Sequence, residues 1–404
     1  MIIERKPPKY PRRGPSCLLV ILVLLGIGFS TFVIQNADEV RDVIIPTPTP
    51  EPTRSATEYA VLADLAERDG DFEEAVGYYE KALELDATKP EIYIRLINLL
   101  VEIDAPERAL EVGEQAVVLA PDNDAVWTAV AKAYIANGDR LDSLGDPTGA
   151  SLQYAEAVRA AEKAVDINPE NATAYAYMAG GLVLPGDARF YERAQEMADY
   201  AVFLEPDNPI AHYYLATVFT YLGFYTEARQ EYQIGIQADP SNIDLYIGLA
   251  YNFFGTGNVP EAILTFEDAV AIDPNNAVAL DGLAYMYIQL GQYPTAEEYA
   301  LQAVEADPNL ARAWGRLGEA YYQQNNYPKA IESLETAVNL YGDATDLNAR
   351  FFYFLASAYI RNSLDDCDKA VPLFNDVLTV SPLYQEAAQE GITTCRLAPL
   401  NTDS

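Results

Sequence analysis

The segment WGRLGEAYYQQNNYPKAIESLETAV, residues 314–338, contains the pattern that decides the fold. Within it, Ala330 and Ala337 stand seven positions apart, and small residues recur along the chain at the phase of each. The phase of Ala330 comprises Ala75, Ala109, Ala157, Ala194, Ala228, Ala262, Ala296, Ala330 and Ala370, with steps of 34, 48, 37, 34, 34, 34, 34 and 40 residues. A period of 34 residues with small residues at a fixed phase is typical of stacked helix pairs.

Each unit of the repeat predicts two short helices. The first helix of one unit carries an apolar stripe at helical spacing, formed by Tyr246, Leu249, Ala250 and Phe253. After a break at residues 255–258, the second helix places Phe266 between two alanines, whose small side chains allow close approach. Pro274 then stops that helix, and Asn276 is placed to cap the next one. A single pair cannot bury its own apolar face, so the units must stack into an elongated solenoid.

The segment 314–338 carries nearly the whole pattern of the tetratricopeptide repeat, and the chain resembles that family over about residues 56–382. The resemblance implies an all-α fold, a right-handed superhelical solenoid of about nine helix pairs. We expect a polar capping helix within residues 383–404, because terminal repeats need a polar outer face.

The N-terminus differs from the repeats. Residues 17–34 form an uncharged run of 18 residues, near the lower end of what crosses a bilayer. Basic residues precede this run and acidic residues follow it. The positive-inside tendency therefore predicts a cytoplasmic tail at 1–16, a transmembrane helix at 17–36 and repeats outside the cytoplasm. This predicts a single-pass protein of the cell membrane, and a cleaved secretion signal is the rival interpretation. Residues 37–55, which include IPTPTPEPTR, are expected to form an extended linker.

The chain is strongly acidic, with a formal net charge of −35 at pH 7. Such a surface repels nucleic acid and anionic lipid headgroups, so we expect no nucleic-acid partner. It suits basic segments of partner proteins or divalent cations, or it serves solubility alone. The sequence leaves the oligomeric state open.

The third unit is 14 residues too long, and the excess falls between its helices at residues 138–153. We expect both helices, or the second alone, to project beyond the stack. Such insertions tend to gather on one face and sometimes bind ligands. Asp139, Asp142 and Asp146 resemble a calcium cluster, but their spacing fails the EF-hand loop, so we predict no metal site.

Two of the three cysteines stand almost symmetrically about Pro382, with Cys367 15 residues before it and Cys395 13 residues after it. If the two flanking helices pack antiparallel around this turn, the thiols meet. A disulfide there would stabilise the end of the array by roughly 3 to 4 kcal/mol in the chain-entropy model, and it needs an oxidising compartment. The alternative is two unrelated buried thiols.

Sequence signals of an enzyme are missing. The single histidine, His212, occupies the inward position where other units place Tyr246 or Trp314. The sequence contains no metal-binding Cys and His spacing, no phosphate-cradling glycine loop and no nucleophile elbow. It therefore predicts no catalytic residue, no metal and no cofactor.

The remaining candidate site is the concave face, which in similar proteins is lined by outward residues of each first helix. That phase gives the groove candidates Tyr213, Thr217, Tyr251, Phe254, Asp281, Tyr285 and Tyr322. A row of tyrosines suits an extended peptide or a glycan, because each ring combines an apolar face with a hydrogen-bonding tip. Packing between neighbouring first helices is the alternative reading of the same residues.

Some members of the family capture acidic C-terminal peptides with a clamp of Lys, Arg and Asn side chains. Here Asn98, Lys132, Arg312 and Arg316 are spread over distant units, which argues against such a clamp. We therefore predict a noncatalytic scaffold for protein or peptide partners, with basic segments among the candidates. A carbohydrate-binding or cell-wall-organising module is the alternative.

Overall fold

The computed structural model describes residues 16–35 and 54–397, without the side chain of Val33. Residues 1–15, 36–53 and 398–404 lie outside the described residues, and with them most of the predicted tail and linker. The chain divides into two compact units, Met1–Ser55 and Ala56–Ser404, and each is described by itself.

The described part of the first unit is one helix, α1 (Cys17–Gln35), whose described side chains are exposed. Over the described residues of the whole chain, no helix has both the length and the apolar character needed to cross a membrane. The predicted transmembrane helix and the single-pass membrane localisation are therefore wrong. The uncharged run already lay at the lower limit of the roughly 17 to 25 residues of a span, and it contains Ser30 and Thr31.

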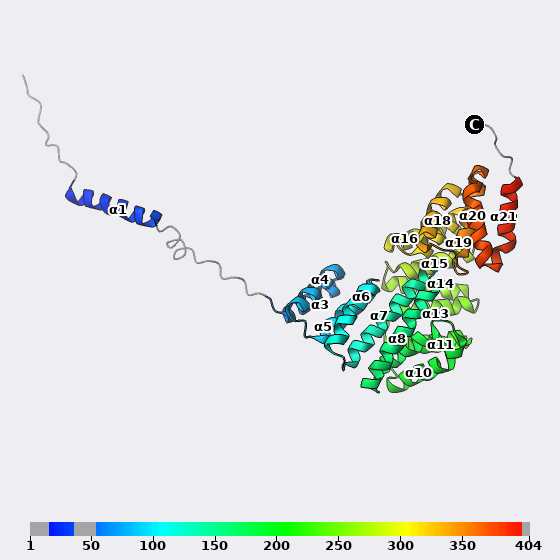
Figure 1. Ribbon diagram of the computed structural model, residues 1–404, viewed down its shortest axis with the longest axis horizontal. Coiled ribbons are helices and arrows are strands. Elements are labelled where there is room, and N and C mark those ends of the chain that lie inside the picture. Colours follow the sequence, from blue (N-terminus) through cyan, green and yellow to red (C-terminus); the bar gives the residue numbers. More distant parts are fainter. Residues whose placement is uncertain (1–15, 36–53, 398–404) are drawn as a thin grey trace, which may run out of the picture. The chain divides into compact units, whose positions relative to one another are not determined.

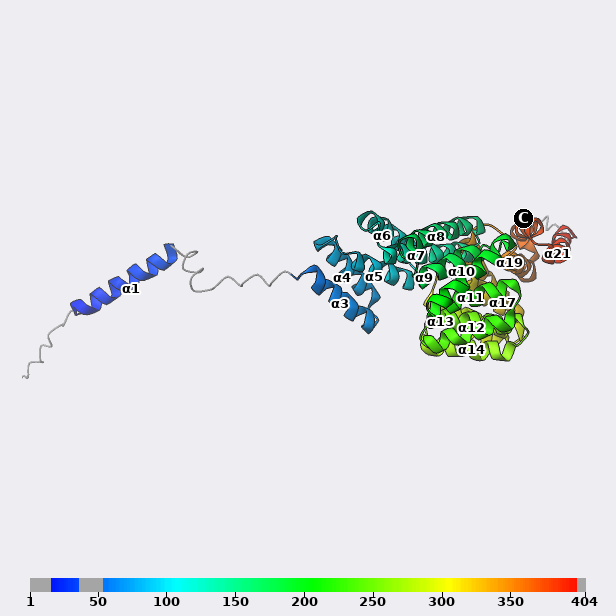
Figure 2. The ribbon, with the colours of Figure 1, turned by 90° about the horizontal axis from the view of Figure 1, so that it is seen from below.

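The second unit is an array of nine helix pairs followed by a terminal helix (Figures 1 and 2). The pairs are α3 (Ala56–Asp69) with α4 (Phe72–Leu85), α5 (Pro90–Glu102) with α6 (Pro106–Leu119), α7 (Asp124–Ser143) with α8 (Pro147–Ile167), α9 (Ala172–Val183) with α10 (Tyr191–Leu204), α11 (Pro209–Leu222) with α12 (Tyr225–Ala238), α13 (Ile243–Gly255) with α14 (Val259–Ile272), α15 (Ala277–Gln289) with α16 (Tyr293–Ala306), α17 (Ala311–Gln323) with α18 (Tyr327–Tyr341), and α19 (Ala349–Asn362) with α20 (Cys367–Val380). The terminal helix is α21 (Gln385–Leu397), and the described residues contain no strand. The predicted all-α repeat solenoid is confirmed.

The alanine series marks the places where helices approach most closely. All nine alanines at the phase of Ala330 are 0% exposed. In every pair except α19–α20, a residue with positive φ makes the turn between the two helices, as Gly257 does at φ +81° between α13 and α14. At the start of α7, α9, α11 and α15, an Asn side chain accepts a hydrogen bond from a backbone N–H, as Asn276 does from Ala279. The sequence period therefore corresponds to one pair, its turn and its cap.

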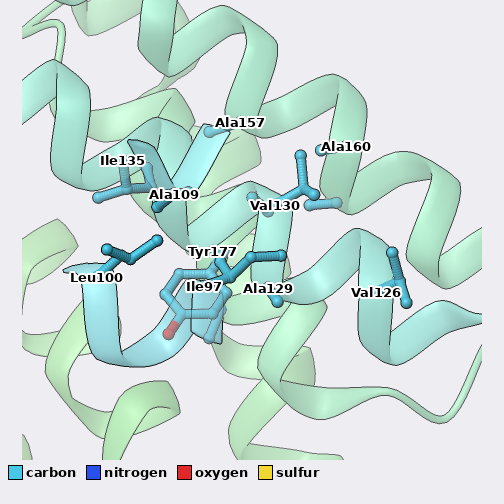
Figure 3. Packing of buried hydrophobic residues seen from close by; sticks show 14 of the residues in the cluster. Ile97, Leu100, Ala109, Val126, Ala129, Val130, Ile135, Ala157, Ala160 and Tyr177 are labelled. Atoms are coloured by element: carbon cyan, nitrogen blue, oxygen red, sulfur yellow. The ribbon is translucent and has the colours of Figure 1, made fainter. Parts of the chain in front are cut away.

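Neighbouring pairs interlock through a large ring and a glycine. The ring of Phe266 on α14 is fully buried, and a Cβ at Gly282 on α15 would overlap it. Tyr232 on α12 meets Gly248 on α13 in the same way. Direct contacts between first helices, such as α5 with α7 and α7 with α9, add to this interface, and Figure 3 draws Ile97 of α5, Val130 of α7 and Tyr177 of α9 as members of one buried cluster.

The third pair differs from the others in length. Helices α7 and α8 contain 20 and 21 residues, whereas the other helices of the array contain 12 to 15. Both helices therefore carry the predicted 14-residue excess. Figure 1 shows them as the long rods of the array, and Gly145 forms the turn at their tip with φ +83°.

The last pair and the terminal helix are joined by a disulfide between Cys367 and Cys395, whose Cα atoms are 5.5 Å apart. Cys367 begins α20 and Cys395 lies near the end of α21, so the bond connects the open ends of two helices that turn at residues 382–384. The buried residues of α21 include Ala388 and Ile392, and Gly391 receives the ring of Phe374 from α20.

The substitution Cys395→Ser is expected to destabilise the end of the array by roughly 3 to 4 kcal/mol, because it releases a loop with a sequence separation of 28 residues. Urea unfolding followed by circular dichroism measures this loss. Reduced wild-type protein should match the variant, and reductant should leave the variant unchanged. Equal stability of oxidised and reduced wild-type protein would contradict the expected contribution.

Candidate functional site

The aromatic groove candidates lie on successive first helices. Their side chains are partly buried, and they contact rings of neighbouring helices. Phe254 of α13 and Tyr285 of α15 have ring centroids 5.2 Å apart, and Tyr322 of α17 lies 5.0 Å from Phe354 of α19. Tyr251 packs edge-to-face against Phe266 at 5.1 Å, and Tyr213 against Tyr214 at 5.0 Å. We call Tyr251, Phe254, Tyr285, Tyr322 and Phe354 the aromatic row.

Two of the groove candidates do not point outward as predicted. Thr217 is buried, and its hydroxyl donates a hydrogen bond to the backbone carbonyl of Tyr213. Asp281 is only 1% exposed. Both predictions took each first helix by itself, whereas neighbouring first helices contact one another and cover part of this phase.

Asp281 belongs to a set of charged residues that we call the arginine cluster, formed by Asp281, Arg312, Arg316, Glu319 and Arg350. Arg312 Nε lies 2.9 Å from Asp281 Oδ2, and Arg316 Nε lies 3.8 Å from Asp281 Oδ1. Glu319, also 1% exposed, accepts a hydrogen bond from the guanidinium of Arg350. The cluster joins α15, α17 and α19.

The sequence analysis counted Arg312 and Arg316 among basic side chains spread over distant units and did not consider Arg350. The structure brings these three arginines together in the C-terminal units. A signal was present, because Glu319 and Arg350 are separated by 31 residues, as are Asp281 and Arg312. A separation slightly below the repeat period places two residues on adjacent first helices, offset by about one helical turn.

Aromatic rings enclose the guanidinium groups of the cluster. Arg316 lies 4.0 Å from the ring centroid of Tyr285 and 5.3 Å from that of Phe351. Arg350 lies 5.7 Å from Tyr285 and 5.9 Å from Phe354. These distances are within the range of cation–π attraction, which is strengthened where the cation is desolvated. The arginine cluster and the aromatic row are therefore one continuous site.

Unsatisfied polar atoms concentrate in this site. In the part of the chain that the structure describes, eight buried side-chain nitrogen or oxygen atoms have no hydrogen-bond partner. Five of them are Asp281 Oδ1, Glu319 Oε2 and the Nε atoms of Arg312, Arg316 and Arg350, although Arg312 Nε and Arg316 Nε also form ion pairs with Asp281. Buried polar groups are nearly always paired in folded proteins, so atoms without partners point to water or a ligand at this position.

The local charge of the cluster is opposite to that of the whole chain. Three guanidinium groups face two carboxylates, which leaves an excess of one positive charge, whereas the full chain has a net charge of −35. Burial raises the pKa of Glu319, while Arg350 and Arg316 oppose that shift. Burial also raises the pKa of Tyr251, so its hydroxyl remains protonated at neutral pH.

The aspartates of the α7–α8 hairpin have other roles than the calcium cluster that they resemble. Asp139 accepts a hydrogen bond from the hydroxyl of Tyr154 at 2.8 Å, and Asp146 caps α8 by accepting from the N–H of Gly149 at 2.8 Å. The Asp139 side chain reaches solvent, but the surrounding helices remove part of its hydration. This desolvation raises the pKa of Asp139 to about 7. Among the described residues, no group of His, Cys, Asp or Glu is arranged to hold a metal ion.

His212 is buried, and both of its ring nitrogens have partners within the protein. Nδ1 lies 2.6 Å from Glu231 Oε2, and Nε2 lies 2.8 Å from the carbonyl oxygen of Pro206. These two acceptors raise the pKa of His212 although burial opposes its charge. The histidine therefore connects α11 to α12 and to the preceding turn.

Comparison with solved structures gives many all-helical relatives of low sequence identity. The yeast protein Tom70 has 17% identity and a TM-score of 0.44, covering 85% of this chain and 88% of that one. The Cut9–Hcn1 heterotetramer of the APC/C gives 16% identity and a TM-score of 0.50, with 85% and 70% covered. PilF of Pseudomonas aeruginosa gives 19% identity and a TM-score of 0.48, with 55% and 98% covered. These likenesses concern the fold alone.

A search of curated proteins gave no match to this sequence. Two family models, both described as tetratricopeptide repeat, match the sequence directly. One matches residues 186–243, 216–277 and 282–346, and the other matches residues 66–133 and 253–309. The matched segments together span more than half of the 404 residues and lie within the array of helix pairs. The chain therefore belongs to the tetratricopeptide repeat family.

Proposed function

We propose that this protein is a noncatalytic interaction scaffold that holds an extended segment of a partner protein on its first-helix face, between α13 and α19. Proteins of the tetratricopeptide repeat family generally act as protein-interaction scaffolds. The observation that carries the proposal for this chain is the gathering, beside the aromatic row, of five buried polar atoms that lack a hydrogen bond. A polypeptide segment can supply both the hydrogen-bond donors and the acceptors that these atoms lack.

The aromatic row and the arginine cluster have complementary roles in this proposal. Partly buried rings offer apolar contact area at low entropic cost, and such anchors dominate the binding energy of interfaces. The arginine cluster supplies a polar anchor with a fixed position, because its guanidinium groups are already held by Asp281 and Glu319. These side chains therefore lose little conformational entropy when a partner binds.

The charge of the chain favours partners that are basic overall. A net charge of −35 accelerates the encounter with positively charged segments and contributes less to holding the complex. The arginine cluster adds a local exception, since it suits an acidic or carbonyl group within such a segment. The glycan alternative is less favoured, because the rings meet one another edge-on instead of presenting flat faces.

The double substitution Tyr251→Ala and Tyr285→Ala is expected to weaken partner binding by about 2 kcal/mol or more, mainly through faster dissociation. Peptides selected from a displayed library on the full-length protein serve as probes, with kinetics measured by surface plasmon resonance. The matched control is Tyr225→Ala, which removes a ring that is 40% exposed on the second helix α12.

Circular dichroism establishes that each variant is folded. Unchanged affinity in the folded double variant, or an equal loss in the Tyr225→Ala control, would refute the assignment of the site to the aromatic row. Added salt should slow association and leave the dissociation rate nearly unchanged.

A further inference from the structure

The loop between α18 and α19, residues 342–348, is a fixed platform. Asn348 is 1% exposed, and its side-chain Oδ1 accepts a hydrogen bond from the backbone N–H of Thr345 at 2.7 Å. Its Nδ2 donates to the backbone carbonyl of Asp343 at 3.0 Å. The loop is therefore held in one conformation by a buried side chain of its own.

The tip of the α7–α8 hairpin lies against this platform. A Cβ at Gly145 would stand 3.0 Å from Asn348 Nδ2, 3.7 Å from Tyr341 Cδ1 and 3.8 Å from Thr345 Cγ2. The third pair thus contacts the connection between the eighth and ninth pairs. Solenoid repeats ordinarily contact only their neighbours in the chain. Two irregular segments, the long hairpin and this loop, meet in space and bring the array back onto itself.

The platform is part of the wall of the candidate site. Tyr341, which borders the platform, stacks on Phe351 with ring centroids 5.9 Å apart and planes 12° apart. Phe351 in turn lies 5.3 Å from the guanidinium of Arg316. A hairpin tip seated against Tyr341 is therefore separated from Arg316 of the arginine cluster by two stacked rings, those of Tyr341 and Phe351.

Electrostatic effects agree with this placement of α7. Burial raises the pKa of both Asp139 and Asp142; Asp244 on α13 adds to the shift of Asp139, and Arg312 on α17 opposes that of Asp142. The carboxylates of α7 thus interact electrostatically with charged residues in the first turns of α13 and α17.

We propose that the α7–α8 hairpin is a clasp, which closes the array by docking on residues 342–348 and must lift from them to admit a partner segment to the arginine cluster. The docking of the hairpin does not depend on the proposed function. Only the statement that the clasp covers a partner-binding site rests on it. At the tip, Gly145 lies against Thr345 and Asn348 of the loop and Tyr341 at the end of α18, whereas the base of the hairpin packs on α6 and α9. Lifting the tip therefore breaks few contacts and costs much less than unfolding a repeat.

The variant Gly145→Asn tests the docked contact. Asparagine tolerates positive φ, and the turn between α17 and α18 already uses Asn325 at φ 60°. The added side chain would press on Asn348, which its two hydrogen bonds prevent from moving aside. The matched control is Gly257→Asn, at φ +81° in the turn between α13 and α14, where a Cβ meets nothing within 4 Å.

Amide hydrogen exchange of residues 342–348 gives a readout that needs no ligand. We expect at least tenfold faster exchange there in Gly145→Asn than in wild-type protein or in Gly257→Asn. A library-selected peptide should also associate with Gly145→Asn at least threefold faster. Unchanged exchange in Gly145→Asn would show that the docked tip does not shield the loop amides from solvent, and the proposal would fail.

A covalent lock provides the opposite test. The pair Gly145→Cys and Thr345→Cys, in full-length protein that also carries Cys17→Ser, should form a disulfide on mild oxidation, because the two positions are in contact. The locked protein should bind the selected peptide at least tenfold more slowly than the Thr345→Cys single variant under the same conditions. No cross-link, or binding at the rate of the single variant, would overturn the clasp. If wild-type protein selects no peptide, the proposed function fails, and exchange and cross-linking still decide whether the clasp exists.

Discussion

Replacing Asp281 by alanine is expected to lower the free energy of unfolding by about 3 to 5 kcal/mol. The carboxylate is 1% exposed and is the ion-pair partner of Arg312 and Arg316, whose side chains are 29% and 15% exposed. Without it, two largely desolvated guanidinium groups lose their counter-charge. Removing one partner of a buried pair costs more than the pair contributes, because the remaining charge stays uncompensated.

The control for this prediction is Glu162→Ala, which breaks an ion pair with the same 31-residue separation but in solvent. The side chains of Arg193 and Glu162 are 49% and 44% exposed. Loss of this ion pair should therefore lower the free energy of unfolding by less than about 1 kcal/mol. Urea unfolding in a Trp127→Phe background leaves Trp314 of α17 as the fluorescent reporter beside the cluster. Equal losses in Asp281→Ala and Glu162→Ala would contradict the burial argument.

The repeat architecture could be predicted from the sequence because its determinants are local and periodic. Small residues such as Ala262 and Ala330 recur at one phase, and the phase alone places them at helix crossings. The disulfide between Cys367 and Cys395 could also be predicted from the sequence, because the two cysteines flank one turn. Such features depend on a single pair or on adjacent pairs.

The candidate site could be predicted only in part, because it depends on how neighbouring first helices turn toward one another. The aromatic residues follow from helical phase, but the same phase wrongly placed Asp281 in solvent. The docking of Gly145 on residues 342–348 was beyond prediction, because it depends on the accumulated rotation over five pairs. The extra length of α7 and α8 could be predicted from the sequence, but the position of the hairpin tip relative to the later repeats could not.

The substitution Phe266→Ala is expected to cost about 3 to 5 kcal/mol, since it deletes a fully buried ring at the interface between two neighbouring pairs. In a solenoid, stability is roughly a sum over neighbour interfaces, so losing this one uncouples α14 from α15 and divides the array at its sixth pair. Urea unfolding reported by Trp127 and Trp314, each in a variant that lacks the other, should then show two separated transitions.

The glycine opposite the ring makes this prediction more specific. Gly282→Ala alone should also destabilise, because its Cβ would overlap Phe266 and packed cores resist added volume. In the double variant, the new methyl group occupies part of the space that the ring has left. The loss in the double variant should therefore be at least 1 kcal/mol smaller than the sum of the two single losses, which a double-mutant cycle measures. Additive losses would mean that the ring and the glycine do not form one interlocking contact. The packing of α14 on α15 would then depend on the alanines alone.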